Sequence, residues 1–397
     1  MAWNFNNFVP ENHRMEIVVN TRLLIRDKLD GIGWFTYETL KRMTCSHPEH
    51  HFIFVFDRDP DESMIFSDNI TPLVLGPQAR HPILFWIWFE FSIGRLLKDL
   101  KPDLFLSPDG YLPLSGKTKK LAVIHDLNFA HYPSDVPWTV RKYYNYFFPR
   151  FASKASRIAT VSQFSKSDII NTYHIDPDKI DVVYNGADIN YHPLPAEEQE
   201  LIRRQYTKGA SYFLFVGSLH PRKNIGRLLL AFASFKKQTG SPMKLLLVGH
   251  RYWWTSELES IYTSLPYKED VIFTGRLPQT ELYRIMAAAY ALTYIPYFEG
   301  FGIPLLEAMQ CDVPVITSNN SSLPEVADNA ALFVDPFSVE SVADAMIRIT
   351  KDEDLRKSLV EAGRIRRTKF SWDRTAELLW ESVEKTVSGV QGKVKSI

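Results

Sequence analysis

The segment YFEGFGIPLLE, from Tyr297 to Glu307, places two carboxylates, Glu299 and Glu307, around a glycine-rich turn. The segment follows a short apolar run, and Pro304 stands where a proline pre-organises the first turn of a helix. Two carboxylates on one side of such a turn can accept hydrogen bonds from several hydroxyl groups. The segment therefore predicts a site for a polyol such as a sugar or a ribose.

The backbone of the same segment offers a second kind of contact. Gly302 lets a ligand approach the main chain, and the amides of Phe301, Gly302 and Ile303 are expected to face outward at the start of a helix. From this segment alone a simpler interpretation stays open. Glu307 would then only complement the helix dipole, and Glu299 would be a solvated turn residue.

Two adjacent cations, Arg222 and Lys223, lie in the segment VGSLHPRKN, between an apolar run and a helical pattern. Gly217 frees the turn after the apolar run, and Asn224 is expected to cap the helix. A guanidinium beside an ammonium suits the diphosphate of a leaving group. Taken alone, such a pair is more often two solvated cations on a loop, so the phosphate interpretation depends on the carboxylate segment in the same half.

His125 and Asp126 follow the apolar run LAVI. In α/β proteins the carboxyl ends of strands are where ligand sites form. A neutral histidine there can hydrogen-bond a sugar hydroxyl, while Asp126 fixes the local backbone or the ring tautomer. The open alternative is a histidine that only packs at the strand end.

The sequence DGIG, which ends at Gly33, follows the first apolar run and precedes a helical pattern. It predicts a loop on which a phosphate approaches a helix N-terminus. Thr36 stands where a dinucleotide-binding fingerprint has its third glycine, which disfavours a nicotinamide-dependent dehydrogenase.

Two charged clusters resemble metal sites, but we predict no metal. The run DRDPD, from Asp57 to Asp61, combines proline with dense charge and is expected to be a solvent-exposed turn. His47, His50 and His51 lie in a polar loop without a matching ligand set. The sequence also has no Ser or Cys in a G-x-S-x-G nucleophile pattern.

These segments need strands and helices to position them. Short apolar runs alternate with helical patterns, which is typical of parallel α/β sheets. The expected strands are Glu16–Asn20, Phe52–Phe56, Pro72–Leu75, Leu104–Leu106, Leu121–His125, Arg157–Val161, Asp181–Tyr184, Tyr212–Val216, Lys244–Val248, Val271–Phe273, Ala291–Tyr294, Pro314–Thr317 and Ala331–Val334. We predict two doubly wound Rossmann-like α/β domains, residues 1–190 and 191–371, with a ligand cleft between them. Ala187–Ala210 is expected to be the crossing between them, and a last helix follows at residues 372–390.

Composition limits the class of protein. The 397 residues are 45% hydrophobic and 23% charged, which suits a globular chain of at least two domains. Lys+Arg and Asp+Glu both number 46, so no overall field attracts nucleic acid, and two scattered cysteines fit a reducing cytosol. The N-terminus lacks the apolar stretch of a secretory signal, and the longest apolar run, Ile83–Phe89, is too short to span a bilayer. We expect a cytoplasmic protein that is not an integral membrane protein.

Together these segments resemble glycosyltransferase family 4, the retaining enzymes of the GT-B fold with two Rossmann-like domains. The specific match is the E-x7-E motif from Glu299 to Glu307 inside EGFGIPLLEAM. Further matches are PVITSNNSSLPEVADNAALFVDP, PRKN, VSQFSK, NGAD, GR at Gly275-Arg276 and HD at His125-Asp126. The patterns GIGWFTYETL and GHRYWW are similar to the mannosyltransferase-B-like branch that builds bacterial polysaccharide.

The resemblance implies a first domain on the acceptor side, a second domain that binds the nucleotide sugar, and a last helix that returns to the first domain. It implies transfer of a hexose with retention of configuration and without a metal or other cofactor. Mannose from GDP-mannose is the favoured donor, and the acceptor is a glycan or a lipid-linked glycan. Arg222 and Lys223 would bind the diphosphate, Glu299 would contact the transferred sugar, and Glu307 would hold the ribose.

The remaining roles implied by the resemblance fall on both domains. The amides of Phe301–Ile303 would hold sugar hydroxyls or phosphate. His125 would face the sugar near the reacting carbon, and Gly33 would let the first-domain loop close on the phosphate. One position departs from the family, because Cys311-Asp312 replaces a small residue and glycine. If that position has a positive φ, Asp is among the few residues that tolerate it.

The acceptor side is least determined by the sequence. The segment His81–Leu100 is apolar nearly all round at its start and basic later, and we favour a buried helix. The alternative is a surface that meets a lipid-linked acceptor at the inner face of the membrane, helped by Arg141, Lys142 and the aromatic residues Tyr143–Phe148. Two other functions stay open: a nucleotide-sugar epimerase of the same architecture and a non-catalytic nucleotide-sugar-binding scaffold.

Overall fold

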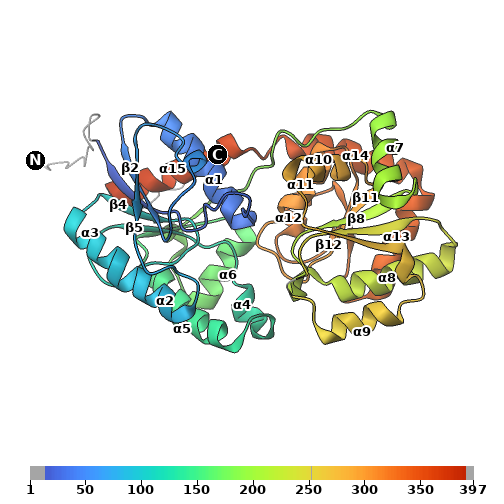
Figure 1. Cartoon of the computed structure of the whole chain (residues 1–397), viewed down its shortest axis with the longest axis horizontal. Coiled ribbons are helices and arrows are strands. Elements are labelled where there is room, and N and C mark those ends of the chain that lie inside the picture. Colours follow the sequence, from blue (N-terminus) through green and yellow to red (C-terminus); the bar gives the residue numbers. More distant parts are fainter. Residues whose placement is uncertain (1–13, 252, 390–397) are drawn as a thin grey trace, which may run out of the picture. The chain divides into compact units, whose positions relative to one another are not determined.

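The computed structural model describes residues 14–251 and 253–389 of the chain. It divides into two compact units. The first contains the chain up to Asn185 together with the helix that begins at Trp372, and the second is Gly186–Ser371. Each unit is built on a parallel sheet with helices packed against it (Figure 1). The expected pair of doubly wound α/β domains is confirmed.

The first unit contains a seven-stranded parallel sheet with the order β3-β2-β1-β4-β5-β6-β7. Its strands are β1 (Glu16–Asn20), β2 (His51–Phe56), β3 (Ile70–Val74), β4 (Leu104–Ser107), β5 (Lys120–Val123), β6 (Arg157–Thr160) and β7 (Ile180–Val182). The chain moves outward from β1 to β3 and then places β4 on the other side of β1. The order of strands therefore reverses between β1 and β4, which is where such sheets bind ligands.

The central strands of this sheet are buried because helices pack on it, whereas the edge strand β3 is largely exposed. Every residue of β4, β5 and β6 is buried. The helices are α1 (Gly31–Ser46), α2 (Pro82–Ile87), the π-helical turn η2 (Trp88–Ile93), α3 (Gly94–Leu100), α4 (Asn128–His131), α5 (Trp138–Lys154) and α6 (Gln163–Tyr173). Parallel strands covered on both faces are continuous apolar runs in the sequence, which explains why their positions were predictable.

The second unit repeats this logic with six parallel strands in the order β10-β9-β8-β11-β12-β13. They are β8 (Tyr212–Val216), β9 (Lys244–Val248), β10 (Val271–Gly275), β11 (Ala291–Tyr294), β12 (Val315–Ser318) and β13 (Ala331–Val334). Here the strand order reverses between β8 and β11. The loops after these two strands carry the Arg222–Lys223 pair and Glu299, so the topology brings the two predicted segments to one place.

The helices of the second unit are α7 (Ala196–Thr207), α8 (Ile225–Thr239), α9 (Ser256–Ser264), α10 (Gln279–Ala287), α11 (Ile303–Gln310), α12 (Leu323–Ala327), α13 (Val339–Lys351) and α14 (Glu353–Arg367). Helix α7 lies within Ala187–Ala210, the expected crossing between the domains, and this segment contains no strand, as predicted. The first turn of α7 carries Glu197 and Glu198 and its last turn Arg204, a charge order that favours a helix.

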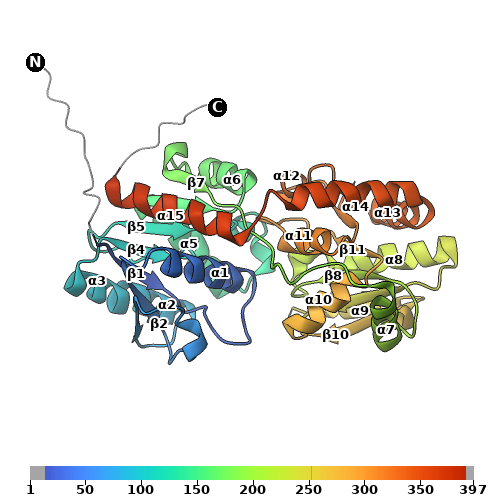
Figure 2. The same ribbon diagram turned by 90° about the horizontal axis from the view of Figure 1, so that it is seen from above.

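The last helix, α15 (Trp372–Ser388), belongs to the first unit and lies alongside α1 (Figure 2). The indole of Trp380 stacks on the imidazole of His47, with 3.7 Å between ring centroids. The hydroxyl of Thr375 donates to the carbonyl of Tyr184 at 2.7 Å. The predicted return of the last helix to the first domain is therefore confirmed.

Two local expectations were wrong. Asp57 is not on a solvent-exposed turn but buried, because its carboxylate accepts from Arg58 and from the amide of Ala79. The run from residue 82 to residue 100 is not a uniformly buried helix, since it buries Trp88 but exposes Phe91. Among the described helices, none combines the length and apolarity needed to cross a bilayer.

Candidate active site

A carboxylate shared by two cations forms the centre of the second unit's strand-end region. Oε2 of Glu299 accepts from Nη1 of Arg222 at 2.6 Å, from the ammonium of Lys223, and from the hydroxyl of Tyr294 at 2.9 Å. The ammonium of Lys223 also contacts the Tyr294 hydroxyl. Glu299 and Lys223 are buried, while the side chain of Arg222 keeps 22% of its surface exposed. The structure thus joins three predicted site residues into one cluster.

The backbone holds the two contributing loops together. The amide of Tyr297 donates to the carbonyl of Arg222 at 3.0 Å. The amide group of Asn224 donates to the carbonyls of Ile295 and Pro336. Asn224 precedes α8 with φ 64° but makes no capping hydrogen bond, so the prediction that its side chain caps this helix was wrong. Its side chain instead ties the cationic turn to the loop that follows β11.

The cluster keeps Glu299 ionised. Burial alone would raise the pKa of its carboxyl, but the charges and hydrogen bonds of Arg222 and Lys223 hold the pKa at about 2. Two cations against one carboxylate leave an excess of one positive charge. An anion such as a diphosphate is what this excess favours.

Gly217 follows β8 and has φ 142°, where side chains are rarely accommodated. Its amide donates to the carbonyl of Val248 at 2.9 Å. Gly249, which sequence reasoning missed, follows β9 with φ 151°, and a Cβ there would lie 1.8 Å from the carbonyl oxygen of Gly217. The two glycines therefore allow the loops after neighbouring strands to touch through their backbones.

The predicted glycine-rich turn lies directly before α11. Gly302 precedes the helix with φ 98°, and a Cβ at this position would lie 2.8 Å from Cδ2 of Leu323. Phe301 is buried and packs edge-on against Phe370. Ile303 is the first residue of α11, and the first amides of a helix have no partner within the helix. The positive φ and the contact with Leu323 therefore favour glycine at position 302.

Glu307 lies one turn into α11 and is half-buried. Burial raises the pKa of its carboxyl to about 7; the negative charge of Asp188 adds to the rise, and a hydrogen bond from the Tyr191 hydroxyl opposes it. Tyr191 is itself buried, and the amide group of Gln279 donates to its hydroxyl at 3.4 Å. Sequence reasoning missed Tyr191 because a lone tyrosine after the NGAD motif carries no pattern of its own.

His125 and Asp126 follow β5 in the first unit. Nε2 of His125 lies 2.8 Å from the carbonyl oxygen of Pro108, which can only accept, so Nε2 carries the proton. Burial lowers the pKa of His125, although the Pro108 carbonyl opposes this, so the ring is neutral and Nδ1 is an acceptor. The carboxylate of Asp126 accepts from the amide of Asn128 at 3.0 Å, which leaves the ring tautomer to Pro108.

Gly33 lies in the first turn of α1 rather than on a free loop. Its amide donates to the Asp30 side chain at 3.0 Å, and a Cβ on Gly33 would lie 3.2 Å from Cδ2 of Leu29. The close approach that this glycine allows is therefore to Leu29, and the amide is occupied by the helix cap. The structure places Gly33 and His125 in the first unit and the other predicted site residues in the second.

The departure at Cys311-Asp312 follows the expected geometry. Asp312 has φ 57°, so the left-handed conformation expected for a glycine here is confirmed. Its carboxylate also accepts from Arg364 at 2.8 Å and from Arg367 at 3.2 Å. The aspartate therefore preserves the left-handed backbone conformation after α11 and forms two ion pairs.

One group of described residues has metal-ligand spacing: His47, Glu49 and His50, whose ligand atoms lie within 4.8 Å of one another. Nδ1 of His50 accepts from the amide of Met15, so its other nitrogen carries the proton in the neutral ring. The ring of His47 is stacked against Trp380. Both imidazoles thus have structural partners that account for their positions.

Comparison with known proteins finds a match to a glycosyltransferase family for each unit. Residues 29–191 match the family described as Glycosyltransferase Family 4, and residues 198–366 match the family described as Glycosyl transferases group 1. The chain is similar to O-antigen chain mannosyltransferase B of Escherichia coli, with 31% identity over 361 residues that cover 88% of this chain and 94% of the relative.

A second relative is also an O-antigen chain mannosyltransferase by name, and a solved structure has the same fold. O-antigen chain mannosyltransferase RfbU of Salmonella typhimurium is 30% identical over 293 residues, which cover 74% of this chain and 78% of the relative. Sucrose-phosphate synthase of Thermosynechococcus elongatus has a similar structure, with a TM-score of 0.77 at 18% identity over 95% of this chain and 100% of that chain. The structural likeness extends across both α/β units.

Proposed function

Because this chain belongs to glycosyltransferase family 4, we propose that it transfers mannose from GDP-mannose to a glycan or lipid-linked glycan during synthesis of a cell-surface polysaccharide. The match of both halves of the chain supports transfer of a sugar. The names of two relatives, both O-antigen chain mannosyltransferases, support the choice of sugar and of product. The enzyme works in the cytoplasm, at the inner face of the membrane.

The observation that carries the proposal is the excess positive charge of the Arg222–Lys223–Glu299 cluster. The diphosphate of the donor binds Arg222 and Lys223, and the two cations stabilise the charge that develops as the nucleoside diphosphate leaves. The reaction proceeds with retention by departure on the same face as attack, and a phosphate oxygen takes the proton of the acceptor hydroxyl. The cations replace a metal in this role, so the reaction is metal-independent.

Other residues position the donor. The carboxylate of Glu307 accepts from the ribose hydroxyls, and the amides at Phe301–Ile303 bind sugar hydroxyls or phosphate. Glu299 contacts the transferred sugar through Oε1, since among its described neighbours all three donors bind Oε2. His125, neutral and with Nδ1 as acceptor, receives a hydrogen bond from a sugar hydroxyl.

The experiment is a nucleotide panel with EDTA present. The purified chain is incubated with GDP, GDP-mannose, UDP and UDP-sugars, and the thermal shift and slow donor hydrolysis are followed. We expect GDP and GDP-mannose to raise Tm most and Arg222→Ala to lose the shift. Arg204→Ala on α7, whose guanidinium is exposed, is the matched control.

Each outcome tests one part of the proposal. Stabilisation by UDP-sugars alone would overturn the mannose donor, and hydrolysis that appears only when Mg²⁺ replaces EDTA would overturn metal independence. NMR of a product with the inverted anomer would overturn retention. A free epimerised sugar nucleotide would instead identify the epimerase.

A further inference from the structure

Two neighbouring helical segments of the first unit expose aromatic side chains. Trp86 and Phe91, from the run α2–η2–α3, are 42% and 56% exposed, and Trp138 and Tyr146, from α5, are 58% and 53% exposed. Soluble proteins bury such side chains or expose them singly. Four of them on two adjacent helices form a patch, which we call the aromatic face.

The π-helical turn explains how this face forms. In the run from residue 82 to residue 100, η2 adds a residue to the turn between Trp86 and Phe91. Phe91 therefore points outward, while Trp88 and Phe89 are buried. The carboxylate of Glu90 turns inward, where it accepts from the amides of Leu114 and Ser115. Among the described residues that line the hollow between these helices, Glu90 is the acidic one, and its carboxylate is thus bound within the protein.

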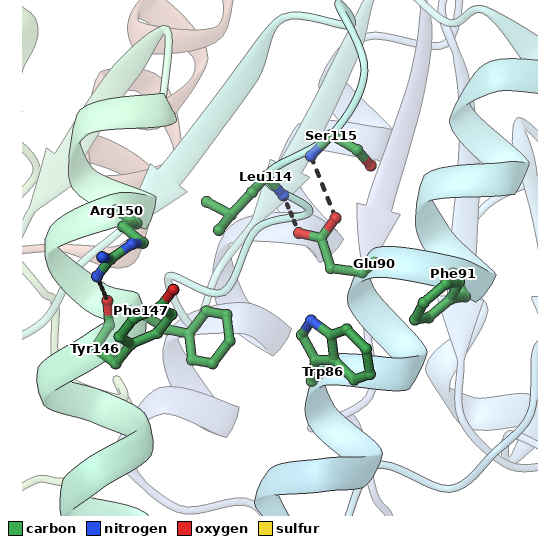
Figure 3. Close-up of a pocket in the computed structure, with 8 residues that line it drawn as sticks. All are labelled: Trp86, Glu90, Phe91, Leu114, Ser115, Tyr146, Phe147 and Arg150. Carbon is green, nitrogen blue, oxygen red and sulfur yellow. Dashed lines mark hydrogen bonds between the residues drawn. The ribbon is translucent and has the colours of Figure 1, made fainter.

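The aromatic face is hollowed at its centre. Figure 3 shows Trp86 and Glu90 from one helical segment opposite Tyr146, Phe147 and Arg150 from α5. These residues line a hollow of about 420 Å³. Tyr146 carries the guanidinium of Arg150 on its ring, 3.6 Å from the centroid. Further along α5, the ammonium of Lys142 lies 4.0 Å from the centroid of the Trp138 ring. Two exposed rings of α5, those of Trp138 and Tyr146, therefore make cation–π contacts.

The charge of α5 indicates which kind of partner binds the aromatic face. In a chain with equal numbers of acidic and basic residues, α5 contains Arg141, Lys142, Arg150 and Lys154 and no Asp or Glu. Exposed Trp and Tyr beside Lys and Arg suit the interface of a bilayer, where rings enter the headgroup region and cations meet anionic lipid. A neutral glycan would use the rings but gain nothing from four cations.

We propose that the aromatic face is a docking surface for an anionic lipid bilayer. The proposal rests on the lipid-linked acceptor of the proposed function for its purpose, because docking would bring the enzyme to that acceptor. No single ring or cation anchors the chain. Binding comes from several shallow insertions together with charge, and is therefore reversible and weakened by salt.

The test is flotation of the full chain with vesicles of phosphatidylglycerol or of phosphatidylcholine, at low and high salt. We expect binding to phosphatidylglycerol vesicles only. Lys142→Glu with Arg150→Glu should weaken it by roughly tenfold or more, since each cation near an anionic surface contributes about 1 kcal/mol. Trp86→Ser with Phe91→Ser should also weaken it by about tenfold.

Matched variants on the second unit control for charge and apolarity. Arg204→Glu with Lys237→Glu changes the same number of exposed cations, and Leu201→Ser with Ile365→Ser removes exposed apolar side chains. Both should bind vesicles as the unaltered chain does. The GDP thermal shift of every variant reports separately on the donor site, so failure of docking and failure of the proposed function are distinguishable.

Three results would overturn the proposal. One is no binding to phosphatidylglycerol vesicles, and another is equal binding by the face variants and their controls. The third is a fluorescence change on addition of a neutral oligosaccharide that the variant Trp86→Ser with Phe91→Ser loses, without vesicle binding by the unaltered chain, which would assign the hollow to a glycan.

Discussion

Both units place an arginine–carboxylate pair where their strand order reverses, but the two pairs differ in charge. In the first unit Nε of Arg22, after β1, donates to Asp109, after β4, at 2.7 Å. In the second unit Arg222, after β8, pairs with Glu299, after β11. The Arg22 pair is one to one, whereas Glu299 is shared with Lys223. The same topological position therefore makes a neutral brace in one unit and a cationic site in the other.

The surroundings of the two pairs follow this difference. Arg22 is 9% exposed, and its guanidinium lies over the ring of Tyr111, 4.6 Å from the centroid. Asp109 also accepts from the side chain of Asn20 at 2.8 Å. The first pair is enclosed, while Arg222 remains accessible. Breaking the first pair should cost stability, and breaking the second should cost activity.

The largest expected effect is on the stability of the first unit. Asp109→Ala leaves Arg22 buried without its carboxylate, which should lower the free energy of unfolding by about 3–5 kcal/mol. Urea denaturation measures this, and the GDP thermal shift should persist because the nucleotide binds the second unit. A loss below about 1 kcal/mol would contradict the distinction between the two pairs.

The next effect is on catalysis in the second unit. Lys223→Ala removes one of two cations from the leaving diphosphate, so transfer should slow by roughly 10²–10³-fold. Arg222 and Tyr294 remain on Glu299, so the fold should be kept. Arg222→Ala should act in the same direction. The measurement is the steady-state rate of sugar transfer. A near-normal rate in both variants would contradict the proposed binding of the diphosphate by Arg222 and Lys223.

A smaller effect concerns pH. In the proposed function, ribose hydroxyls donate to ionised Glu307, so GDP should bind less tightly below the Glu307 pKa of about 7, by up to about tenfold per pH unit. For stability the sign is opposite, because the raised pKa means that the folded protein holds this proton while the unfolded chain releases it. Stability from this group is full below the ordinary pKa of a glutamate and is lost as pH rises to about 7. Calorimetric titration of the protein with GDP from pH 6 to 8 should show an affinity that changes with pH, and Glu307→Gln should remove this change. An affinity for GDP that stays constant with pH in the unaltered chain would refute the prediction.

The smallest effect comes from another shared carboxylate, Asp312. Asp312 is bound by two arginines, as Glu299 is by two cations, but Arg364 is 49% exposed. Exposed pairs contribute about 0–1 kcal/mol. Asp312→Gly should therefore be nearly neutral, whereas Asp312→Ala should destabilise the chain by about 1–2 kcal/mol because of its positive φ. Equal unfolding midpoints for the two variants would count against this.

Much of the fold could be predicted because buried parallel strands are continuous apolar runs. The bounds of β8, β9, β11 and β13 agree with the predicted ones. The loops after β8 and β11 were recognisable because their glycines and charges are close in sequence. Their meeting at Glu299 follows from the order of the strands, which apolar runs alone do not specify.

What was missed depends on contacts between distant residues. Arg22 follows β1 and Asp109 follows β4, so the two residues are 87 positions apart in the chain, and neither lies in a recognisable motif. The exposure of Phe91 depends on a π-helical turn, which shifts the helical period in a way that an apolar segment does not reveal. The roles of the site residues toward a ligand remain predictions.

The shared carboxylate has a consequence for how a nucleotide arrives. Because Glu299 acts as an internal counterion, the field outside the cluster is that of one charge rather than two. Long-range steering by this cluster is correspondingly weak and falls off within a Debye length, about 8 Å at physiological ionic strength. In the proposed function, the cluster therefore distinguishes among anions on contact, by the fit of a diphosphate to two fixed donors.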